Sequence, residues 1–466
     1  MSQRPGTSEA PLRVCTVGSG PSAFYAAEAL LKAEGLDVRI DVFDRLPTPF
    51  GLVRGGVAPD HQKIKSVSKV YEKTAEDPRF RFFGNVRIGR DLAIADLERS
   101  YHMIVWAIGC ESDNRLSIPG EELAGVHSAT EFVGWYNGHP DYRDRAFNLE
   151  TARRVAIVGN GNVAMDCSRI LLAPVTALAT TDIADHAIAA LRQSTVRELV
   201  LLGRRGPAQA AFSPKEIEEI AELDDVDVAV AEQDAALDDY SRNWLESQAR
   251  SAQRNVKFLA ERAAHGTTGK LKQLHCRFLV APVAFEGHDG RVRAVRVQHA
   301  VLEPDRDGTP RPRAIDRYST IEVELVFKAI GYRGVPLQGL AFDDNKGIVA
   351  NVDGRVLSAA SGEARIGHYV VGWAKRGPTG LVGTNSPDSK ATVLCMLQDL
   401  RQDRTLPASG QDLAAVLQQR KVDYVTWQDW RRLDSHEQAV GQARGKVRHK
   451  EPSVDGLMQA VRSLRG

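Results

Sequence analysis

Two adjacent arginines, Arg204 and Arg205, follow the apolar run at residues 199–202 and a single glycine. A guanidinium group keeps its charge at physiological pH and binds phosphate through two parallel hydrogen bonds. On an ordinary surface loop the same pair would only be solvated, which is the plainer interpretation. The chemistry of this pair therefore depends on whether the chain presents a phosphate in front of it.

A glycine-rich turn near the N-terminus indicates one site for phosphate groups. The elements expected around it are a strand at 12–17, a helix at 24–32 and a strand that ends at Asp44. This order is typical of the βαβ unit that binds dinucleotides. Gly18 allows the tight turn, Gly20 lets the backbone approach a pyrophosphate, and Ala23 is small enough for close packing. Asp44 stands where an acid would bind a ribose hydroxyl.

The same order recurs further along the chain around Gly159 and Gly161. The elements expected there are a strand at 155–158, a helix at 165–172 and a strand at 198–202. Arg204 and Arg205 take the place of the ribose-binding acid, so the second nucleotide is predicted to be NADP, whose 2′-phosphate an acid would repel. Arg204 comes 45 residues after Gly159, so residues 173–195 must form an inserted loop or helix.

Three further segments are expected to close strands with glycine turns. The runs "MIVWAIG", ending at Gly109, and "VELVFKAIG", ending at Gly331, are predicted to pass close under a dinucleotide, although each could be an ordinary strand end. Residues 368–385 read as a strand followed by glycine-rich turns. The chain beyond about residue 400 is polar and is predicted to be helical.

Length and composition limit the class of protein. A chain of 466 residues favours two or three domains, and a net charge of +1 argues against an overall electrostatic grip on nucleic acid or membrane. The five cysteines form no C-x-x-C pair, so neither a dithiol centre nor an iron–sulfur cluster is indicated. Residues 1–13 lack an apolar stretch of signal length, so a cytoplasmic protein with free thiols is the default expectation, and a processed organellar protein stays open as the alternative.

Charge is uneven in the middle of the chain. Residues 216–239 hold eleven acids and no Lys or Arg, whereas residues 241–277 hold eight Lys or Arg and two acids. Two solvated helix faces are the plainer interpretation, and a basic docking surface for an acidic partner is the sharper one. Arg242, Arg250 and Arg254 are spaced at intervals of eight and four, which predicts that they lie near one helix face.

The sequence contains no nucleophile–base pair and no metal-ligand cluster, so no metal site is predicted. Two nucleotide sites without an acid–base motif favour hydride transfer between two cofactors. The first site, without arginines, would take FAD, and the second NADPH. The protein would then have to hold the nicotinamide about 3–3.5 Å from the flavin ring and tune the flavin with nearby dipoles.

Several long motifs resemble the adrenodoxin reductase family, most closely its NADPH–ferredoxin reductases from actinobacteria. They are "PTPFGLVRGGVAPDHQKIK", "EFVGWYNGHP", "GNGNVAMD", "GRRGPAQAAFSPKE" and "VVGWAKRGPTGLVGTN". The resemblance runs from about residue 12 to 460. It implies an α/β fold of two Rossmann-like domains of the glutathione reductase type. The implied bounds are an FAD domain at 1–111 and 336–466, with C-terminal helices, and an inserted NADP domain at 112–335.

The resemblance also implies roles for individual residues. The implied FAD contacts are Ser22, Asp44, Leu52, Ile88, Trp373, Gly380, Leu381 and Val382. The implied NADP contacts are Asn160, Gly161, Asn162, Val163, Arg204, Arg205, Glu216 and Gly380. His61 and Glu219 match positions near the nicotinamide and the flavin edge, although His61 could be a turn residue and Glu219 one acid of an acidic helix. Asp44 stands where the family commonly has glutamate.

The implied activity is that of an NADPH–ferredoxin reductase, with electrons leaving singly to a separate iron–sulfur ferredoxin. Ferredoxins are generally acidic, so the stretch 241–277 is the expected docking region. Three alternatives remain open at this point. They are a flavoprotein of the glutamate-synthase small-subunit type, which usually carries N-terminal cysteine clusters absent here, a flavin monooxygenase, and a nucleotide-binding redox sensor with negligible turnover.

Overall fold

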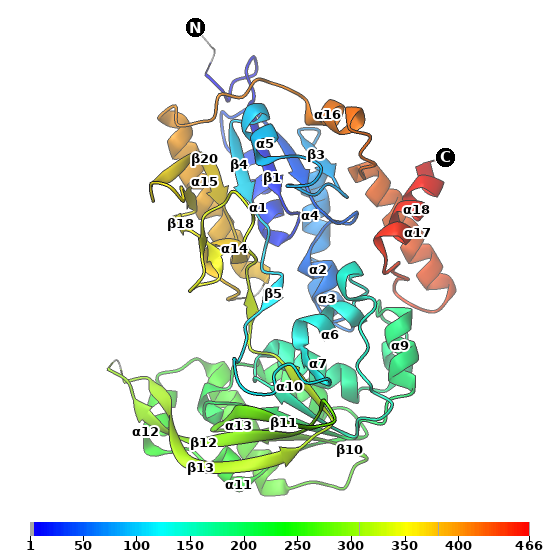
Figure 1. Ribbon diagram of the computed structural model, residues 1–466, viewed down its shortest axis with the longest axis vertical. Helices are drawn as coiled ribbons and strands as arrows, with labels where there is room; N and C mark the ends of the chain where they lie inside the picture. The colour runs from blue at the N-terminus through cyan, green and yellow to red at the C-terminus, as the bar shows by residue number, and fades with distance from the viewer. Residues whose placement is uncertain (1–3, 307, 381, 466) are drawn as a thin grey trace. The chain divides into compact units, whose positions relative to one another are not determined.

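The structure is a computed structural model that describes residues 4–306, 308–380 and 382–465. The chain divides into two compact units (Figure 1). Unit 1 comprises residues 1–113 and 331–466, and unit 2 comprises the intervening residues 114–330. Among the described residues, no helix combines the length and apolar character needed to cross a membrane.

Unit 1 is built on a seven-stranded sheet in the order β18-β19-β20-β4-β1-β2-β3. The strands from β20 to β3 pair in parallel, and β18 and β19 pair antiparallel at one edge. Apolar side chains alternate between two buried clusters, one on each face: Val14 and Val105 belong to one, Cys15 and Trp106 to the other. Cover on both faces is what a parallel sheet requires.

The strands of this sheet are β1 (Leu12–Val17), β2 (Val38–Phe43), β3 (Phe80–Phe83), β4 (Met103–Trp106), β18 (Asn351–Val352), β19 (Arg355–Leu357) and β20 (Ala364–Val370). Two small antiparallel pairs are β5 (Ser112–Asp113) with β15 (Tyr332–Arg333), and β16 (Phe342–Asp343) with β17 (Ile348–Val349). The helices are α1 (Pro21–Leu31), α2 (Leu52–Gly55), α3 (Gln62–Lys65), α4 (Ser68–Ala75), α5 (Ile94–Ser100), α14 (Trp373–Arg376), α15 (Asn385–Arg401), α16 (Leu413–Gln419), α17 (Trp427–Ala443) and α18 (Val454–Arg465).

Unit 2 is built on a six-stranded parallel sheet in the order β6-β14-β7-β8-β10-β9. A three-stranded antiparallel sheet, β11-β12-β13, packs on one face through an apolar cluster that includes Ala156, Val200 and Val295. The helices cover the other face through the cluster that contains Val155 and Ile170. Both units therefore bury a parallel sheet between two layers.

The strands of unit 2 are β6 (Val126–Ser128), β7 (Arg154–Val158), β8 (Glu198–Leu202), β9 (Val226–Val230), β10 (Lys272–Arg277), β11 (Val280–His288), β12 (Arg291–Pro304), β13 (Pro310–Glu322) and β14 (Leu325–Lys328). Its helices are α6 (Ala129–Tyr136), α7 (Asn162–Leu172), α8 (Val175–Leu178), α9 (Asp185–Arg192), α10 (Pro214–Ala221), α11 (Glu232–Ala235), α12 (Asp239–Glu246) and α13 (Arg250–His265).

The predicted α/β class is confirmed, and the predicted strands at 12–17 and 198–202 match β1 and β8 residue for residue. Strand β7 begins at Arg154, one residue before the predicted start, and β2 ends at Phe43, one residue before Asp44. The helices begin earlier than predicted. Helix α1 starts at Pro21 because proline suits the first helical position, where its missing N–H costs nothing. The segment between α7 and β8 holds the short helices α8 and α9, which accounts for the long spacing before Arg204.

Candidate dinucleotide-binding sites

The first glycine turn, between β1 and α1, has the shape that a bound pyrophosphate requires. Gly18 has φ +97°, and a Cβ on it would lie 2.4 Å from the carbonyl oxygen of Ala107. A Cβ on Gly20 would meet no atom within 4 Å, so open space lies in front of this residue. The turn therefore brings the backbone N–H groups at the start of α1 up to an open approach.

Asp44, directly after β2, fixes this turn from the side. Its Oδ2 accepts hydrogen bonds from the Ser19 N–H at 2.8 Å and the Ser19 hydroxyl at 2.5 Å, and its Oδ1 accepts from the Leu46 N–H at 2.9 Å. Burial raises the pKa of the Asp44 carboxyl, and these hydrogen bonds act in the opposite direction. A carboxylate has about four acceptor positions, so Asp44 can still accept from a ribose hydroxyl.

Two other parts of unit 1 reach the same turn. The Phe50 N–H donates to the Ser19 carbonyl at 2.9 Å. Gly51, with φ +48°, lies so close that a Cβ on it would be 3.1 Å from the Gly20 Cα. Leu52 then begins α2, beside the first glycine turn. Ile88 is buried in the apolar cluster that contains residues at the ends of β1 and β2.

The segment after β20 supplies a further wall beside α1. Gly372 has φ +70°, and a Cβ on it would lie 2.0 Å from the Ser22 hydroxyl oxygen. Trp373 follows, and its indole N–H is buried without a hydrogen-bond partner among the described residues. A buried polar group of this kind calls for an explanation, and a bound acceptor supplies one. Gly380 has φ +80°, Val382 packs partly buried against the core, and Leu381 lies outside the described residues.

The second glycine turn, between β7 and α7, repeats the geometry of the first. Gly159 has φ +118°, and a Cβ on it would lie 2.2 Å from the Ala329 carbonyl oxygen. A Cβ on Gly161 would meet no atom within 4 Å. The side-chain amide nitrogen of Asn160 is buried without a hydrogen-bond partner among the described residues. Asn162 instead accepts the Ser213 N–H at 2.8 Å.

Arg204 and Arg205 lie directly after β8, the strand next to β7. Arg204 is exposed and Arg205 half-buried, and neither guanidinium has a hydrogen bond or ion pair with any described residue. Burial, together with the charges of Arg204 and Arg311, lowers the pKa of Arg205. Two neighbouring guanidinium groups without an anionic partner have the chemistry to bind a phosphate group.

Sequence reasoning missed the buried cation that positions Glu216 and Glu219. Arg169 on α7 is 5 % exposed; its guanidinium lies 2.8 Å from the Glu216 carboxylate and 3.7 Å from that of Glu219, both on α10. Lys215 also approaches Glu219, at 2.8 Å. The available signal was an arginine on an apolar helix, three residues after Asp166, which it also pairs with at 2.6 Å. These five charged groups form one ion-pair network between α7 and α10.

His61 occupies the N-cap position of α3, where its N–H donates to the Ala58 carbonyl at 3.0 Å. Its backbone thus has the turn role that such a histidine often plays. Val163 lies in the first turn of α7 and is partly buried against the core of unit 2.

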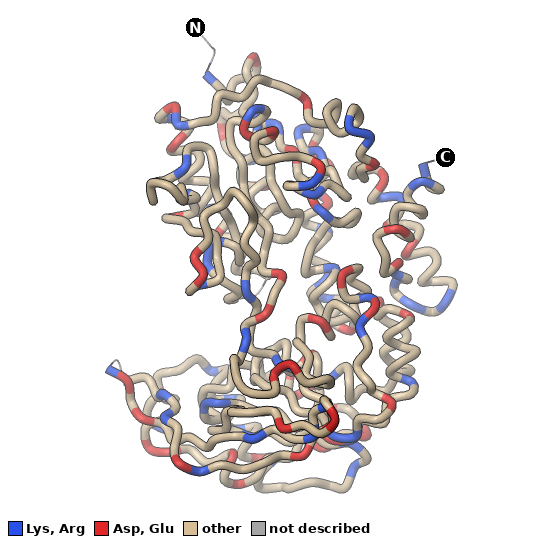
Figure 2. Tube along the Cα trace, viewed as in Figure 1, with Lys and Arg blue, Asp and Glu red and all other residues tan. Residues whose placement is uncertain are grey.

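The prediction that Arg242, Arg250 and Arg254 share one helix face is wrong. Helix α12 ends at Glu246 and α13 begins at Arg250, so Arg242 belongs to a separate helix. Arg254 pairs with Glu218 at 2.7 Å, and Arg242 approaches Asp239 at 3.3 Å. The acidic and basic stretches therefore neutralise each other in part, and Figure 2 shows both signs interspersed in unit 2.

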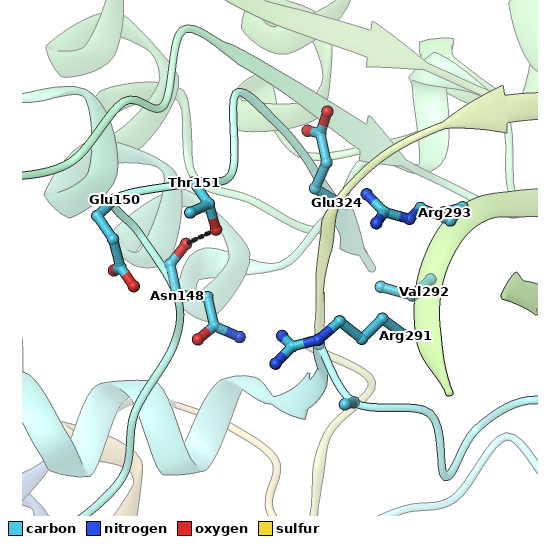
Figure 3. Close-up of a pocket in the computed structure, with 9 residues that line it drawn as sticks. Asn148, Glu150, Thr151, Arg291, Val292, Arg293 and Glu324 are labelled. Atoms are coloured by element: carbon cyan, nitrogen blue, oxygen red, sulfur yellow. Dashed lines mark hydrogen bonds between the residues drawn. The ribbon is translucent and has the colours of Figure 1, made fainter. Parts of the chain in front are cut away.

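A separate surface cavity of about 380 Å³ lies in unit 2, at the N-terminal end of β7, remote from the glycine turn at its other end. Arg291, Arg293, Asn148 and Glu324 are among its lining residues (Figure 3). The Glu324 carboxylate accepts the Arg154 N–H at 2.8 Å, which ties this acid to the strand. The cavity is not part of either dinucleotide site.

No protein-family model matches the chain. The chain does match individual proteins of known name along nearly its whole length. The chain is 41 % identical over 97 % of its length to the mitochondrial NADPH:adrenodoxin oxidoreductase of Arabidopsis thaliana, covering 96 % of that protein. It is 42 % identical over 96 % of its length to the NADPH-ferredoxin reductase FprA of Mycobacterium tuberculosis, covering 99 % of that protein. A solved structure of this FprA in complex with NADPH superposes with a TM-score of 0.89 over 97 % of the chain and 99 % of FprA, at 40 % identity.

Proposed function

Because the chain belongs to the adrenodoxin reductase family, we propose that it is an NADPH–ferredoxin reductase, an oxidoreductase that carries FAD and uses NADPH. The observation that carries this proposal is the pair of glycine turns with opposite chemistry beside them. One is held by an acid, Asp44, and the other faces two arginines without anionic partners, Arg204 and Arg205.

Unit 1 fits FAD. The start of α1 offers backbone N–H groups to the pyrophosphate, Gly20 leaves the approach open, and Asp44 would accept from the adenosine ribose. The buried indole N–H of Trp373 would donate to a cofactor acceptor, with Ser22, Leu52, Ile88, Gly380, Leu381 and Val382 as the other proposed contacts. When bound, FAD accepts a hydride from NADPH and releases the two electrons one at a time.

Unit 2 fits NADP. The start of α7 would bind the pyrophosphate, and Arg204 and Arg205 would bind the 2′-phosphate that distinguishes NADP from NAD. The buried amide of Asn160 would donate to the nucleotide. Gly161, Asn162, Val163, Glu216 and Gly380 are the other proposed contacts. Arg169 holds Glu216 in place with a 2.8 Å ion pair, so the proposed contact is rigid before the nucleotide arrives.

We propose that His61 and Glu219 act at the reacting ends of the cofactors. The imidazole of His61 can accept or release a proton, so it would balance the proton when charge changes at the flavin. Glu219 is one quarter exposed, and its carboxylate lies 2.8 Å from Lys215 and 3.7 Å from Arg169, two cations that orient it. Their substitution should change the rate of hydride transfer with little effect on the binding of either dinucleotide.

The electron acceptor is an iron–sulfur ferredoxin on a separate chain, since the five cysteines here are scattered and all unpaired. Within the proposed docking region, residues 241–277, we propose that helix α13 makes the contact with ferredoxin. Arg250 on this helix is exposed and has no ion-pair partner among the described residues, whereas Arg254 is paired with Glu218. Arg250→Glu should therefore reduce the salt dependence of ferredoxin reduction more than Arg254→Glu. An equal salt dependence in wild type and Arg250→Glu would remove α13 from the interface.

We propose a cytoplasmic location, because five free cysteines, four of them buried, fit a reducing compartment. Immunofluorescence of the endogenous protein tests this directly.

Anaerobic spectroscopy tests the proposed function. The purified protein is mixed with an excess of NADPH, then with an excess of a [2Fe–2S] ferredoxin, and the flavin and cluster absorption bands are followed together. We expect the flavin band to bleach and the ferredoxin then to be reduced over many turnovers. Protein without a flavin band, or reduced flavin that no ferredoxin reoxidises, would overturn the proposal.

A further inference from the structure

An acid at the start of α15 holds the turn that carries Trp373. Oδ2 of Asp388 accepts the Gly372 N–H at 2.7 Å, and Oδ1 lies 3.1 Å from the Lys375 ammonium and 3.8 Å from the Arg376 guanidinium. The Asp388 side chain is 10 % exposed. One nearly buried carboxylate thus contacts the residue before Trp373 and two cations after it.

The rest of this turn is fixed by hydrogen bonds that do not involve Asp388. The Lys375 ammonium donates to the Thr392 hydroxyl at 3.0 Å, and the Asn351 amide donates to the Lys375 carbonyl at 3.0 Å. The Arg376 guanidinium donates to the Asn385 side chain at 2.8 Å. Asp388 is therefore the anionic centre of a polar network that includes both cations of α14.

The neighbouring residue on α15 holds the opposite wall. The Ser389 hydroxyl donates to the Ser22 carbonyl at 3.0 Å, in the first turn of α1. Ser22 is also the residue whose hydroxyl oxygen lies where a Cβ on Gly372 would be. Two consecutive residues, Asp388 and Ser389, thus set the register between the Trp373 turn and the start of α1.

We propose that Asp388 is a positioning residue for the flavin site: it fixes the Trp373 turn and offsets the charges of Lys375 and Arg376 next to it. This inference rests on the proposed function, because it assumes that Trp373 contacts FAD. In this role the Asp388 carboxylate has two separable functions: it accepts the hydrogen bond from Gly372, and it places a negative charge beside two cations.

The two parts predict different behaviour for two substitutions. Asp388→Ala removes the acceptor and the charge, so the buried Gly372 N–H loses its partner and the turn loses its anchor. Asp388→Asn keeps an acceptor oxygen but removes the charge, so two cations remain unbalanced. Reduced flavin carries more negative charge than oxidised flavin, and excess positive charge nearby favours the reduced form.

Asp399 provides a matched control on the same helix. Its carboxylate is 5 % exposed and pairs with Arg355 at 2.8 Å, and it accepts the Tyr369 hydroxyl at 3.0 Å. Asp399 is therefore a buried, ion-paired aspartate on the same helix as Asp388. The partners of Asp399 lie on β19 and β20, outside the Trp373 turn. A structural cost common to buried ion pairs would appear in Asp399→Ala as well.

The experiment measures three quantities on the purified holoprotein: the dissociation constant of FAD, the visible absorption spectrum of the bound flavin and its midpoint potential. We expect Asp388→Ala to raise the dissociation constant at least tenfold and to change the shape of the flavin band. We expect the dissociation constant of FAD in Asp388→Asn to stay within threefold of the wild-type value. The same variant should favour reduced over oxidised flavin about tenfold, which corresponds to a rise of about 30 mV in the midpoint potential of a two-electron couple. Asp399→Ala should leave the spectrum and potential unchanged.

Equal flavin spectra, potentials and FAD affinities in wild type, both Asp388 variants and Asp399→Ala would overturn the inference while leaving the proposed function intact. Equal changes in Asp388→Ala and Asp399→Ala would also overturn it, because the effect would then be general destabilisation. A wild-type protein that binds no FAD would instead overturn the proposed function.

Discussion

The two glycine turns of this protein share a backbone and differ in what surrounds it. Gly18 and Gly159 both have positive φ, and each is pressed against a carbonyl oxygen at the end of a neighbouring strand, of Ala107 or Ala329. The two alanines begin the two Ala-Ile-Gly segments of the sequence. A glycine is therefore required at both positions by the same contact, whatever nucleotide is bound.

The surroundings differ in how the polar groups next to each turn are partnered, although the Trp373 indole N–H of unit 1 also has no partner among the described residues. Beside the first turn, the Asp44 carboxylate accepts three hydrogen bonds from unit 1 itself. Beside the second, the Asn160 amide and the guanidinium groups of Arg204 and Arg205 have no partner among the described residues. The first turn thus closes on its own acid, as suits a cofactor that stays bound. The second leaves these donors without partners, as suits the proposed role of a site whose NADP exchanges in each turnover.

The largest effects are expected at the first glycine of each turn. Gly18→Ala and Gly159→Ala each place a Cβ within 2.4 Å of a backbone carbonyl oxygen, at a positive φ that alanine rarely adopts. Each should cost about 3 kcal/mol or more of stability in its own unit and abolish the binding of its own dinucleotide. Binding of FAD and NADPH is measured separately for each variant. If each variant lost the binding of both FAD and NADPH, the prediction that each turn binds its own dinucleotide independently would be wrong.

The second glycine of each turn provides the matched control. Gly20→Ala and Gly161→Ala add a methyl group to open space, at negative φ. The unfolding free energy of both variants should lie within about 1 kcal/mol of the wild-type value. Each variant should nevertheless bind its own dinucleotide at least tenfold more weakly, because the methyl group occupies the approach to the phosphates.

A smaller effect on both folding and binding is expected at Asp44. Asp44→Ala leaves the Ser19 and Leu46 N–H groups without their acceptor, which should cost about 2–4 kcal/mol of unfolding free energy in unit 1. The affinity for FAD should fall together with the stability of unit 1, whereas the affinity for NADPH should stay unchanged. Denaturant unfolding followed by flavin fluorescence, together with NADPH titration, checks both. Unchanged stability would show that these hydrogen bonds do not hold the turn.

The smallest effect on folding is expected at Asn160. Asn160→Ala removes a buried donor that has no partner, so the unfolding free energy should change by less than about 0.5 kcal/mol. NADPH should bind about tenfold more weakly, or about 1.4 kcal/mol. Asn162→Ala is the control: it removes the acceptor of the Ser213 N–H and should destabilise unit 2. Equal NADPH affinity in Asn160→Ala and wild type would exclude Asn160 from the site.

Local features of the sequence were sufficient to predict both glycine turns. Strand β1 and strand β8 coincide with the predicted ranges, because each is a short, mostly apolar run that ends at a glycine turn. Helix α7 began three residues before the predicted start because Asn162 follows the turn directly, and polar residues in a first turn weaken the apolar pattern.

Contacts between distant residues were not predictable in this way. Arg169 pairs with Glu216 across 47 residues, and Asp388 reaches Gly372 across 16, and neither pair leaves a periodic signal. The prediction of one shared helix face failed for a local reason: helical spacing was extended from Arg242 to Arg254 across residues 247–249, where the structure ends one helix and begins another.

The most direct test of the contrast between the two turns is nucleotide selectivity at the arginine pair. Dissociation constants for NADPH and NADH are measured by titration of the oxidised holoprotein in wild type and in the double variant Arg204→Gln with Arg205→Gln. We predict that NADPH binding weakens at least 100-fold, since each arginine contributes a charge-assisted hydrogen bond of about 1.5–3 kcal/mol, while NADH binding stays within threefold. Equal losses for NADPH and NADH would contradict the assignment of the 2′-phosphate to these arginines.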